Sequence, residues 1–360
     1  MKKLLCISSI AFTGLLTSLN APAAENSFPG QWALNPAGGG AGWLEVKPAN
    51  GSLTGTLLWM GGSPEPQTRV WMDGDKLVAL RVWNEDVRDA AGKVIRTLPH
   101  PMMLTATVAG DQIRGNLSQP ANDGASISKD EFTGVRIPPA PPKPDLSTIR
   151  FGEPIQLFNG KNLEGWAVIG GAHWSTLGLK KPDGTSAQGW VPIDPKVANG
   201  WSAQDGLLVN DPVQTPGQPH RHYGNIQTLR DFEDFNLTLE VNVGPNGNSG
   251  VYLRGIYEVQ VFDSYGKPLD RHNMGAIYGR ITPTVAAEKP AGEWQTLDIT
   301  LVQRHATVIL NGKKIIDNEP LDGCTGGALW SDQSRPGPIY LQGDHTGIKY
   351  RNIVLRPVVK

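Results

Sequence analysis

Hydrophobic and polar residues alternate with a period of two over many short segments of this chain, and few segments show the period of a helix. Such runs, rich in β-branched and aromatic residues, are typical of strands. Turn sequences such as Asp73-Gly-Asp75 and Asn311-Gly312 separate them. The pattern therefore predicts an all-β protein.

A proline-rich stretch, Ile137 to Asp145, divides the chain into two parts. Proline fixes φ and lacks a backbone donor, so residues 137–149 are predicted to form a stiff extended linker. Residues 25–136 are predicted to form a small antiparallel β-barrel or sandwich. Its expected strands include residues 32–34, 53–59, 76–83, 103–108 and 112–117.

After the linker, residues 150–360 show a second set of strand patterns, separated by turns such as Asp205-Gly206. This spacing favours a two-sheet jelly roll with a concave sheet that carries a groove. The expected strands are residues 201–204, 207–209, 225–228, 235–243, 251–254, 257–262, 294–302, 307–310, 314–317, 339–342 and 348–356.

The N-terminus has the charged, apolar and small-residue order of a secretory signal, over residues 1–24. We therefore expect a periplasmic or secreted protein without a membrane span. The remaining chain has one cysteine, Cys324, which we interpret as a structural turn residue. The 33 Lys and Arg residues nearly balance the 34 Asp and Glu residues without a basic run, which argues against nucleic acid as a partner.

The segment 248–263 places polar side chains on two consecutive predicted strands. Because side chains alternate along a strand, Tyr252 and Arg254 share one face of the first strand, while Glu258 and Gln260 share one face of the second. Polar groups among core-forming residues predict the floor of a polar cleft. The alternative is an ordinary solvated sheet face with an ion pair.

Several motifs after the linker occur in a fixed order across about residues 150–358. They are residues 157–166, 231–237, 247–254, 257–263, 275–279, 289–294, 310–312 and 341–353. As a set they resemble the 3-keto-disaccharide hydrolase domain family. The resemblance implies a concanavalin-like jelly roll, similar to laminarinase-type glucanases, and cleavage of disaccharides or glycosides that carry a ketone at C3.

A ketone at C3 acidifies the hydrogen on C2, so a base can remove it and the C1 substituent can leave. This route needs a base, a group that stabilises the enolate oxygen, and an acid. The candidate catalytic residues are Glu258, Asp263, Asp344 and His345, of which Glu258, Asp263 and His345 are candidate bases and Asp344 can orient His345. The candidate substrate-binding residues are Tyr252, Arg254, Gln260, Tyr278, Gln342, Arg351 and His222.

Two other functions stay open. Glu258 to Asp263 resembles the Glu-x-Asp-x-x-Glu strand of laminarinase-type retaining hydrolases, in which a bulge brings the last carboxylate onto the same face. Here Gln260 replaces the middle Asp and Asp263 the last Glu. A non-catalytic carbohydrate-binding module is the second alternative.

No cofactor is predicted. His220 and His222 lie two residues apart and can form a metal pair, but no third ligand is evident. The expected partner is a small-molecule carbohydrate, and the sequence gives no oligomeric state.

Overall fold

The computed structural model describes residues 27–89, 92–121, 126–169, 198–213 and 223–359, and the counts below refer to these residues. Within them the chain is nearly all β, and no helix has the length and apolar character needed to cross a membrane. The strands are β1 (Gly30–Pro36), β2 (Gly42–Ala49), β3 (Ser52–Trp59), β4 (Gly61–Pro66), β5 (Arg69–Asp73), β6 (Lys76–Arg88), β7 (Val94–Ala109), β8 (Gln112–Pro120), β9 (Ile127–Ile137), β10 (Ile155–Gln156), β11 (Trp166–Ile169), β12 (Trp201–Gln204), β13 (Leu207–Asn210), β14 (Asn225–Thr228), β15 (Phe235–Val243), β16 (Asn248–Leu253), β17 (Tyr257–Phe262), β18 (Trp294–Val302), β19 (His305–Leu310), β20 (Lys313–Pro320), β21 (Tyr340–Leu341) and β22 (Ile348–Pro357).

Strands β1–β9 form one antiparallel sheet in the order β2-β1-β9-β8-β7-β6-β5-β3-β4. Strand β2 also pairs with β3, so the sheet closes on itself as a barrel. Closure removes most exposed sheet edges. The inward positions are apolar, including Trp32, Leu44, Leu77 and Leu104, each fully buried.

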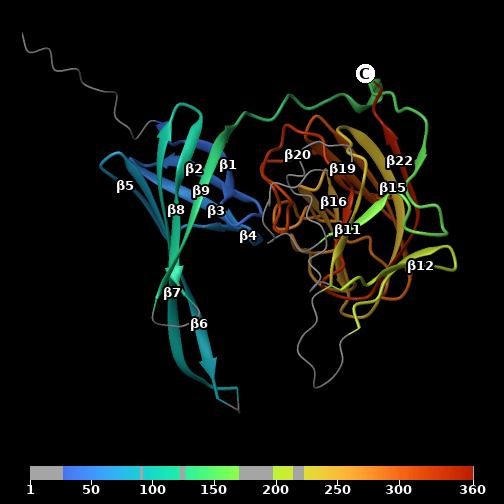
Figure 1. The fold of residues 1–360 in the computed structure, drawn as a ribbon, viewed down its shortest axis with the longest axis horizontal. Coiled ribbons are helices and arrows are strands. Elements are labelled where there is room, and N and C mark those ends of the chain that lie inside the picture. Colours follow the sequence, from blue (N-terminus) through green and yellow to red (C-terminus); the bar gives the residue numbers. More distant parts are fainter. Residues whose placement is uncertain (1–26, 90–91, 122–125, 170–197, 214–222, 360) are drawn as a thin grey trace, which may run out of the picture.

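Strands β6 and β7 extend well beyond the barrel as a hairpin arm (Figure 1). The sequence pattern predicted only their inner parts, because most residues of the outer part are exposed on both faces and show no alternation between a buried and an exposed face. Trp83 there stacks on His100 with ring centroids 4.1 Å apart. Short-range alternation does not reveal such an unburied hairpin.

The linker after β9 lacks regular structure except for a 3₁₀ helix, η2 (Leu146–Thr148), which the sequence pattern did not predict. Asp145 caps this turn by accepting a hydrogen bond from the backbone N–H of Ser147 at 3.0 Å. The side chain of Asn318 donates to the carbonyl oxygen of Pro144 at 2.8 Å. The linker is thus held against the second part of the chain.

Strands β10–β22 form a two-sheet sandwich, the predicted jelly roll. One sheet has eight strands, β12-β13-β22-β15-β18-β19-β20 with β10 paired to β22, and the other has the order β11-β14-β21-β16-β17. Strand β15 alternates strictly between buried and half-buried residues. Its inward side chains meet those of the five-stranded sheet in one apolar cluster, which excludes water from between the sheets.

The barrel packs directly against the sandwich (Figure 1). Ala33, Trp43 and Leu58 of the barrel belong to the apolar cluster of the sandwich. The Arg280 guanidinium lies 4.4 Å from the centre of the Trp43 ring and donates to the carbonyl oxygen of buried Cys324 at 2.8 Å. Burial raises the pKa of the Cys324 thiol to about 11, as expected of a structural cysteine.

Candidate active site

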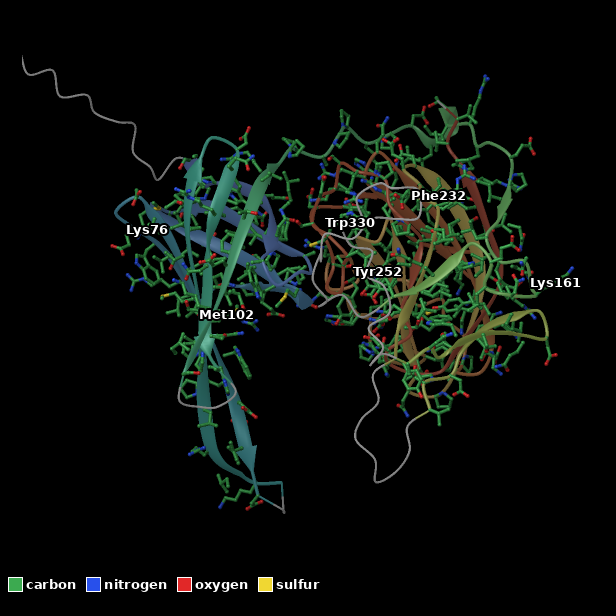
Figure 2. All side chains as sticks on the ribbon, in the orientation of Figure 1. Lys76, Met102, Lys161, Phe232, Tyr252 and Trp330 are labelled. Carbon is green, nitrogen blue, oxygen red and sulfur yellow. The ribbon has the colours of Figure 1, made fainter. Side chains whose placement is uncertain are left out.

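One face of the five-stranded sheet is polar, and a pocket of about 160 Å³ opens on it. Strand alternation directs Val251 and Val259 into the core, and directs Tyr252, Glu258 and Gln260 to the opposite face. Figure 2 labels Tyr252 on the side of the sandwich nearer the barrel. The pocket is lined by Gly61, Gly62, Asn248, Tyr252, Glu258, Gln260, Tyr278, Gly326, Gly327, Tyr340, Gln342, Asp344 and His345.

The side chain of Glu258 lies over a glycine of the neighbouring strand. Gly250 of β16 pairs with Gln260 of β17, next to Glu258. A Cβ atom at position 250 would lie 2.2 Å from Oε1 of Glu258, closer than any side chain tolerates. The absence of a side chain at Gly250 therefore provides the space for the carboxyl group.

Glu258 is 3% exposed, and its burial raises the pKa of the carboxyl group to about 8. A hydrogen bond from Tyr252 opposes this rise, while the negative charge of Asp344 adds to it. A carboxyl group taken out of water without a cation favours its neutral form. At neutral pH Glu258 is thus predominantly protonated and can donate a proton.

The contacts of Tyr252 fit a protonated Glu258. The Tyr252 hydroxyl lies 2.9 Å from Oε2 of Glu258 and 2.8 Å from the carbonyl oxygen of Gly326. A phenol has one proton and can donate to only one of them at a time. Tyr252 donates to Glu258 when the carboxyl group is ionised, which lowers its pKa, and can donate to Gly326 instead when Glu258 is protonated.

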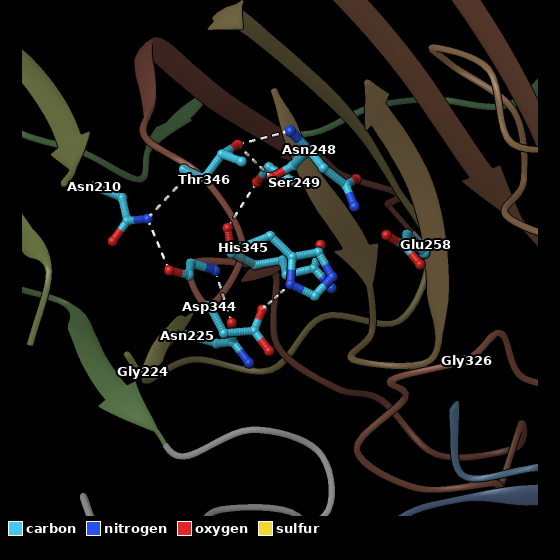
Figure 3. A network of polar contacts seen from close by, with 12 residues as sticks. Asn210, Gly224, Asn225, Asn248, Ser249, Glu258, Gly326, Asp344, His345 and Thr346 are labelled. Atoms are coloured by element: carbon cyan, nitrogen blue, oxygen red, sulfur yellow. Dashed lines mark hydrogen bonds and ion pairs between the residues drawn. The ribbon is translucent and has the colours of Figure 1, made fainter. Parts of the chain in front are cut away.

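Asp344 and His345 lie together at the opposite side of the pocket (Figure 3). Nδ1 of His345 is 3.4 Å from Oδ1 of Asp344, and both side chains are partly exposed. A carboxylate at this ion-pair distance can orient the imidazole, whose other ring nitrogen can act as a base. The pair can therefore accept a proton from a molecule in the pocket.

Backbone contacts hold the loop that carries this pair. The N–H of Gly343 donates to Oδ1 of Asn225 at 2.7 Å, and the Asn210 amide donates to the carbonyl oxygen of Gly343 at 2.9 Å. On the other side of the pair, Thr346 accepts from the N–H of Asn248 at 2.7 Å. Figure 3 shows these contacts on both sides of Asp344 and His345.

Three polar atoms lining the pocket have no hydrogen-bond partner within the described chain. They are Oδ1 of Asn248, Oε1 of Gln342 and Oδ1 of Asp344. Buried acceptors without partners are rare in folded proteins, since each loses its bond to water. Sugar hydroxyl groups are donors that can satisfy them.

Tyr278 lies at the rim of the pocket and is half-buried. Burial raises the pKa of its hydroxyl, and the negative charge of Glu258 adds to the rise. The hydroxyl therefore stays a hydrogen-bond donor at neutral pH. Gln260 uses its side-chain oxygen to accept from the N–H of Val261 at 3.1 Å, so its amide NH₂ is the group available to a ligand.

Arg254 does not line the pocket, contrary to the strand alternation assumed for it. Strand β16 ends at Leu253, and Arg254 has a φ of 56° in the turn that follows, so the alternation stops before it. Its guanidinium donates instead to the carbonyl oxygens of Arg335, at 3.0 Å from Nε, and Gln333. It fixes a loop and is absent from the pocket.

Asp263 also lies outside the pocket. Strands β16 and β17 pair without interruption from Asn248 opposite Phe262 to Leu253 opposite Tyr257, so the expected bulge is absent. Without the bulge, an odd number of positions separates Asp263 from Glu258, so strand alternation does not bring the two side chains to the same face. Its Oδ2 accepts from the N–H of Asn246 at 2.9 Å and fixes the preceding turn.

Arg351 lies on β22 of the other sheet, where it donates to Glu240 at 2.9 Å from Nε. Its guanidinium also lies 4.0 Å from the centre of the Trp294 ring. Arg351 therefore cannot reach the pocket as predicted. His220 and His222 lie outside the described residues, and among those described no group of three His, Cys, Asp or Glu side chains can hold a metal ion.

Four sets of pocket residues were not predicted from the sequence, namely Asn248, Tyr340, Gly326-Gly327 and Gly61-Gly62. Asn248 lies in the motif 247–254. Tyr340 lies two residues before Gln342 in the expected strand 339–342, so the strand pattern could have identified both residues. Tyr340 stacks on Tyr252 with ring centroids 4.3 Å apart. The Gly326-Gly327 pair and Gly61-Gly62 of the barrel lie far from Glu258 in sequence and gave no such signal.

A larger hollow of about 490 Å³ opens on the barrel, with Lys76, Arg114, Glu131 and several Asn and Thr residues in its lining. The described lining contains one carboxylate and no histidine. The smaller pocket combines a buried carboxyl group with a carboxylate–imidazole pair. We therefore place the chemistry in the smaller pocket.

Similar solved structures include proteins from Parabacteroides distasonis described as candidate glycosyl hydrolases. One is 27% identical, covering 61% of this chain and 93% of its own, with a TM-score of 0.40. Another is 26% identical, covering 57% of this chain and 100% of its own, with a TM-score of 0.39. SCLam, a non-specific endo-beta-1,3(4)-glucanase from family GH16, is 10% identical, covering 62% of this chain and 93% of its own, with a TM-score of 0.31.

None of the curated proteins compared with the chain matches it. A family match is clear, however, and it spans residues 153–356, more than half of the chain. The matched range contains the whole polar face of the five-stranded sheet and the loop with Asp344 and His345. This chain belongs to the family described as the 3-keto-alpha-glucoside-1,2-lyase-like domain, a carbohydrate-active, glycosyl hydrolase-like family.

Proposed function

We propose that this protein cleaves 3-keto-disaccharides or 3-keto-glycosides by removing the C2 proton and expelling the C1 substituent. The observation that carries the proposal is the pairing of opposite proton-transfer groups in one small pocket. Glu258 is buried and holds a proton, while Asp344 and His345 can accept one. Elimination needs this combination of acid and base.

In the proposed reaction the free ring nitrogen of His345 takes the proton from C2. The electron pair of the C2–H bond moves toward the C3 carbonyl and gives an enolate, whose oxygen can accept from Tyr278 or the Gln260 amide. The enolate then reforms the ketone, a double bond forms between C1 and C2, and the C1–O bond breaks. Glu258 protonates the leaving oxygen.

Addition of water to the resulting enone completes a net hydrolysis. The hydroxyl adds to C1 and a proton returns to C2, so atoms balance without an oxidant or reductant. The protonated His345 can supply that proton. If the enone leaves before water adds, the same site acts as a lyase.

Direct hydrolysis by a retaining mechanism needs a second carboxylate, and its candidate, Asp263, is absent from the pocket. That reading required Glu258 and Asp263 on one face, about 5 to 5.5 Å apart. Asp263 lies beyond the end of β17, no bulge interrupts the pairing of β16 and β17, and Asp263 is absent from the pocket lining that contains Glu258. We therefore favour elimination over direct displacement at C1.

The test is to incubate the protein with matched native and C3-oxidised glucosides and to measure the released aglycone. We expect release from the oxidised substrate alone, a primary isotope effect with deuterium at C2, and at least about a 100-fold loss in His345→Ala. Release from the native glucoside without an isotope effect would establish direct hydrolysis. Binding of sugar without any release would establish a carbohydrate-binding module.

We also propose that the protein is exported. The supporting observation is the sequence pattern of residues 1–24, which lie outside the described residues. Mass spectrometry of protein from fractionated cells should find the periplasmic or secreted form without these residues. An intact N-terminus on protein from the cytoplasm would contradict the proposal.

A further inference from the structure

The segment Met60–Ser63, which turns the chain from β3 into the first residues of β4, reaches the pocket of the jelly roll. Gly61 and Gly62 line the pocket together with Glu258 and His345, although the barrel lies outside the matched family range. The N–H of Gly327 donates to the carbonyl oxygen of Met60 at 2.9 Å. The two parts of the chain therefore meet at the site itself.

This turn packs against a residue that contacts the Tyr252 hydroxyl. A Cβ atom on Gly326 would lie 2.1 Å from the carbonyl oxygen of Gly62, so the two backbones touch. The carbonyl oxygen of Gly326 in turn lies 2.8 Å from the Tyr252 hydroxyl. The turn thus supports the backbone group that orients the partner of Glu258.

The same turn is linked to the second pocket tyrosine, Tyr278, through the ring of His272. Oγ of Ser63 lies 2.7 Å from Nε2 of His272, and Nδ1 of His272 lies 2.5 Å from Oδ1 of Asp270. The His272 ring meets the Tyr278 ring edge-on, with centroids 5.0 Å apart.

Space around Ser63 is tight, which fixes where its hydroxyl can lie. A Cβ atom on Gly279 would lie 2.6 Å from Oγ of Ser63 and 3.2 Å from its Cα. Gly279 has a φ of 68°, a conformation that favours glycine. The chain from Asp270 through His272 to Ser63 therefore has little freedom.

We propose that the Met60–Ser63 turn of the barrel contributes residues to the active site, and that Ser63 is a positioning residue for Tyr278. Asp270 and Ser63 hold the two nitrogens of the His272 ring, and this ring packs edge-on against Tyr278 and sets the direction in which Tyr278 presents its hydroxyl to the substrate. The backbone of Gly61 and Gly62 closes the pocket on the barrel side. The kinetic test of this inference rests on the proposed function, because it uses 3-keto-glucoside as the substrate. The NMR test does not, because it needs no substrate.

The first readout is kinetic, with 3-keto-glucoside as the probe. We expect Ser63→Ala to lose about 10- to 100-fold in kcat with a smaller change in KM, because Tyr278 no longer holds the productive geometry. Ser52→Ala, on an exposed residue of the same barrel, is the matched control and should behave as the natural protein.

The second readout is the NMR signal of the Tyr278 ring carbon that bears the hydroxyl, assigned with Tyr278→Phe. It should shift in Ser63→Ala and stay unchanged in Ser52→Ala, whether or not the protein turns over any glycoside. If Ser63→Ala does not fold, His272→Phe removes the same link and keeps the ring volume. A folded variant with an unchanged Tyr278 signal would overturn the inference.

The two readouts separate the two proposals. If the natural protein leaves 3-keto-glucoside intact while the Tyr278 signal shifts in Ser63→Ala, the proposed function fails and the positioning role stands. If the natural protein is active and Ser63→Ala matches Ser52→Ala in kcat and in the Tyr278 signal, the positioning role fails and the proposed function stands.

Discussion

Glu240 and Glu258 lie on strands of the two sheets of one sandwich, and their surroundings move their pKa values in opposite directions. Burial is the largest single influence on Glu240 and raises its pKa, but the hydrogen bonds from Arg351 and Asn352 and the charge of Arg351 together outweigh it and lower the pKa overall. Glu258 is more deeply buried, has no cationic partner among the described residues, and has a pKa of about 8. The residue type is the same; the environment makes one a structural anion and the other a proton donor.

The largest expected effect is a difference in activity between variants of the two glutamates. Glu258→Gln removes the transferable proton and should lower kcat/KM for a 3-keto-glucoside by about 10² to 10⁴-fold. Glu240→Gln, the matched change on the other sheet, should stay within about threefold of the natural protein, because Glu240 lies outside the pocket lining. Equal losses in both variants would remove the distinction.

The next effect comes from the glycine beneath Glu258. Gly250→Ala places a Cβ atom 2.2 Å from Oε1 of Glu258, so the carboxyl group must move. We expect about a 10- to 100-fold loss of activity with about 1 to 3 kcal/mol of destabilisation. Gly244→Ala, where a Cβ atom meets nothing within 4 Å, is the control. Full activity in Gly250→Ala would show that the position of Glu258 does not matter.

A smaller effect concerns the pH dependence of turnover. If Glu258 acts as the acid, kcat should fall as the pH rises through its pKa of about 8. The hydrogen bond from Tyr252 lowers that pKa, so Tyr252→Phe should move the fall to higher pH. Rates of both proteins should be measured across pH 6 to 10. A shift toward lower pH in Tyr252→Phe would contradict the assignment.

The smallest effect is on stability, and it has opposite signs for the two glutamates. Between the unfolded pKa near 4.5 and the folded pKa near 8, Glu258 holds more protons in the folded state, so its contribution to stability is lost as pH rises. Glu258→Gln should reduce this loss by about 1 to 3 kcal/mol. Glu240 has a lowered pKa, so its contribution is present above its unfolded pKa and disappears as pH falls through its folded value. Urea titrations from pH 3 to 9 check both signs.

The sequence predicted the fold well, because strand alternation is a local property. The predicted bounds of β15, β17 and β18 agree with the structure, and Tyr252, Glu258 and Gln260 face the pocket as the alternation requires. The same rule failed for Arg254 because the strand ends one residue earlier. It failed for Asp263 because no bulge interrupts the pairing of β16 and β17.

The rest of the site depends on contacts that no local pattern contains. Gly61 and Ser63 meet the site only because the closed barrel presents its β3–β4 turn to the jelly roll. The barrel's own sequence showed no catalytic constellation. The space above Gly250 likewise follows from the pairing of two strands and is not visible in either strand alone.

The most direct measurement is the titration of the Glu258 carboxyl group itself. NMR of protein labelled with ¹³C at the glutamate carboxyl carbon, with Glu258→Gln to assign the signal, gives the pKa without any substrate. We expect a titration midpoint near pH 8, with the group protonated at neutral pH. A midpoint near the ordinary value of about 4.3 would contradict it, because Glu258 would then hold no proton to give to a leaving group.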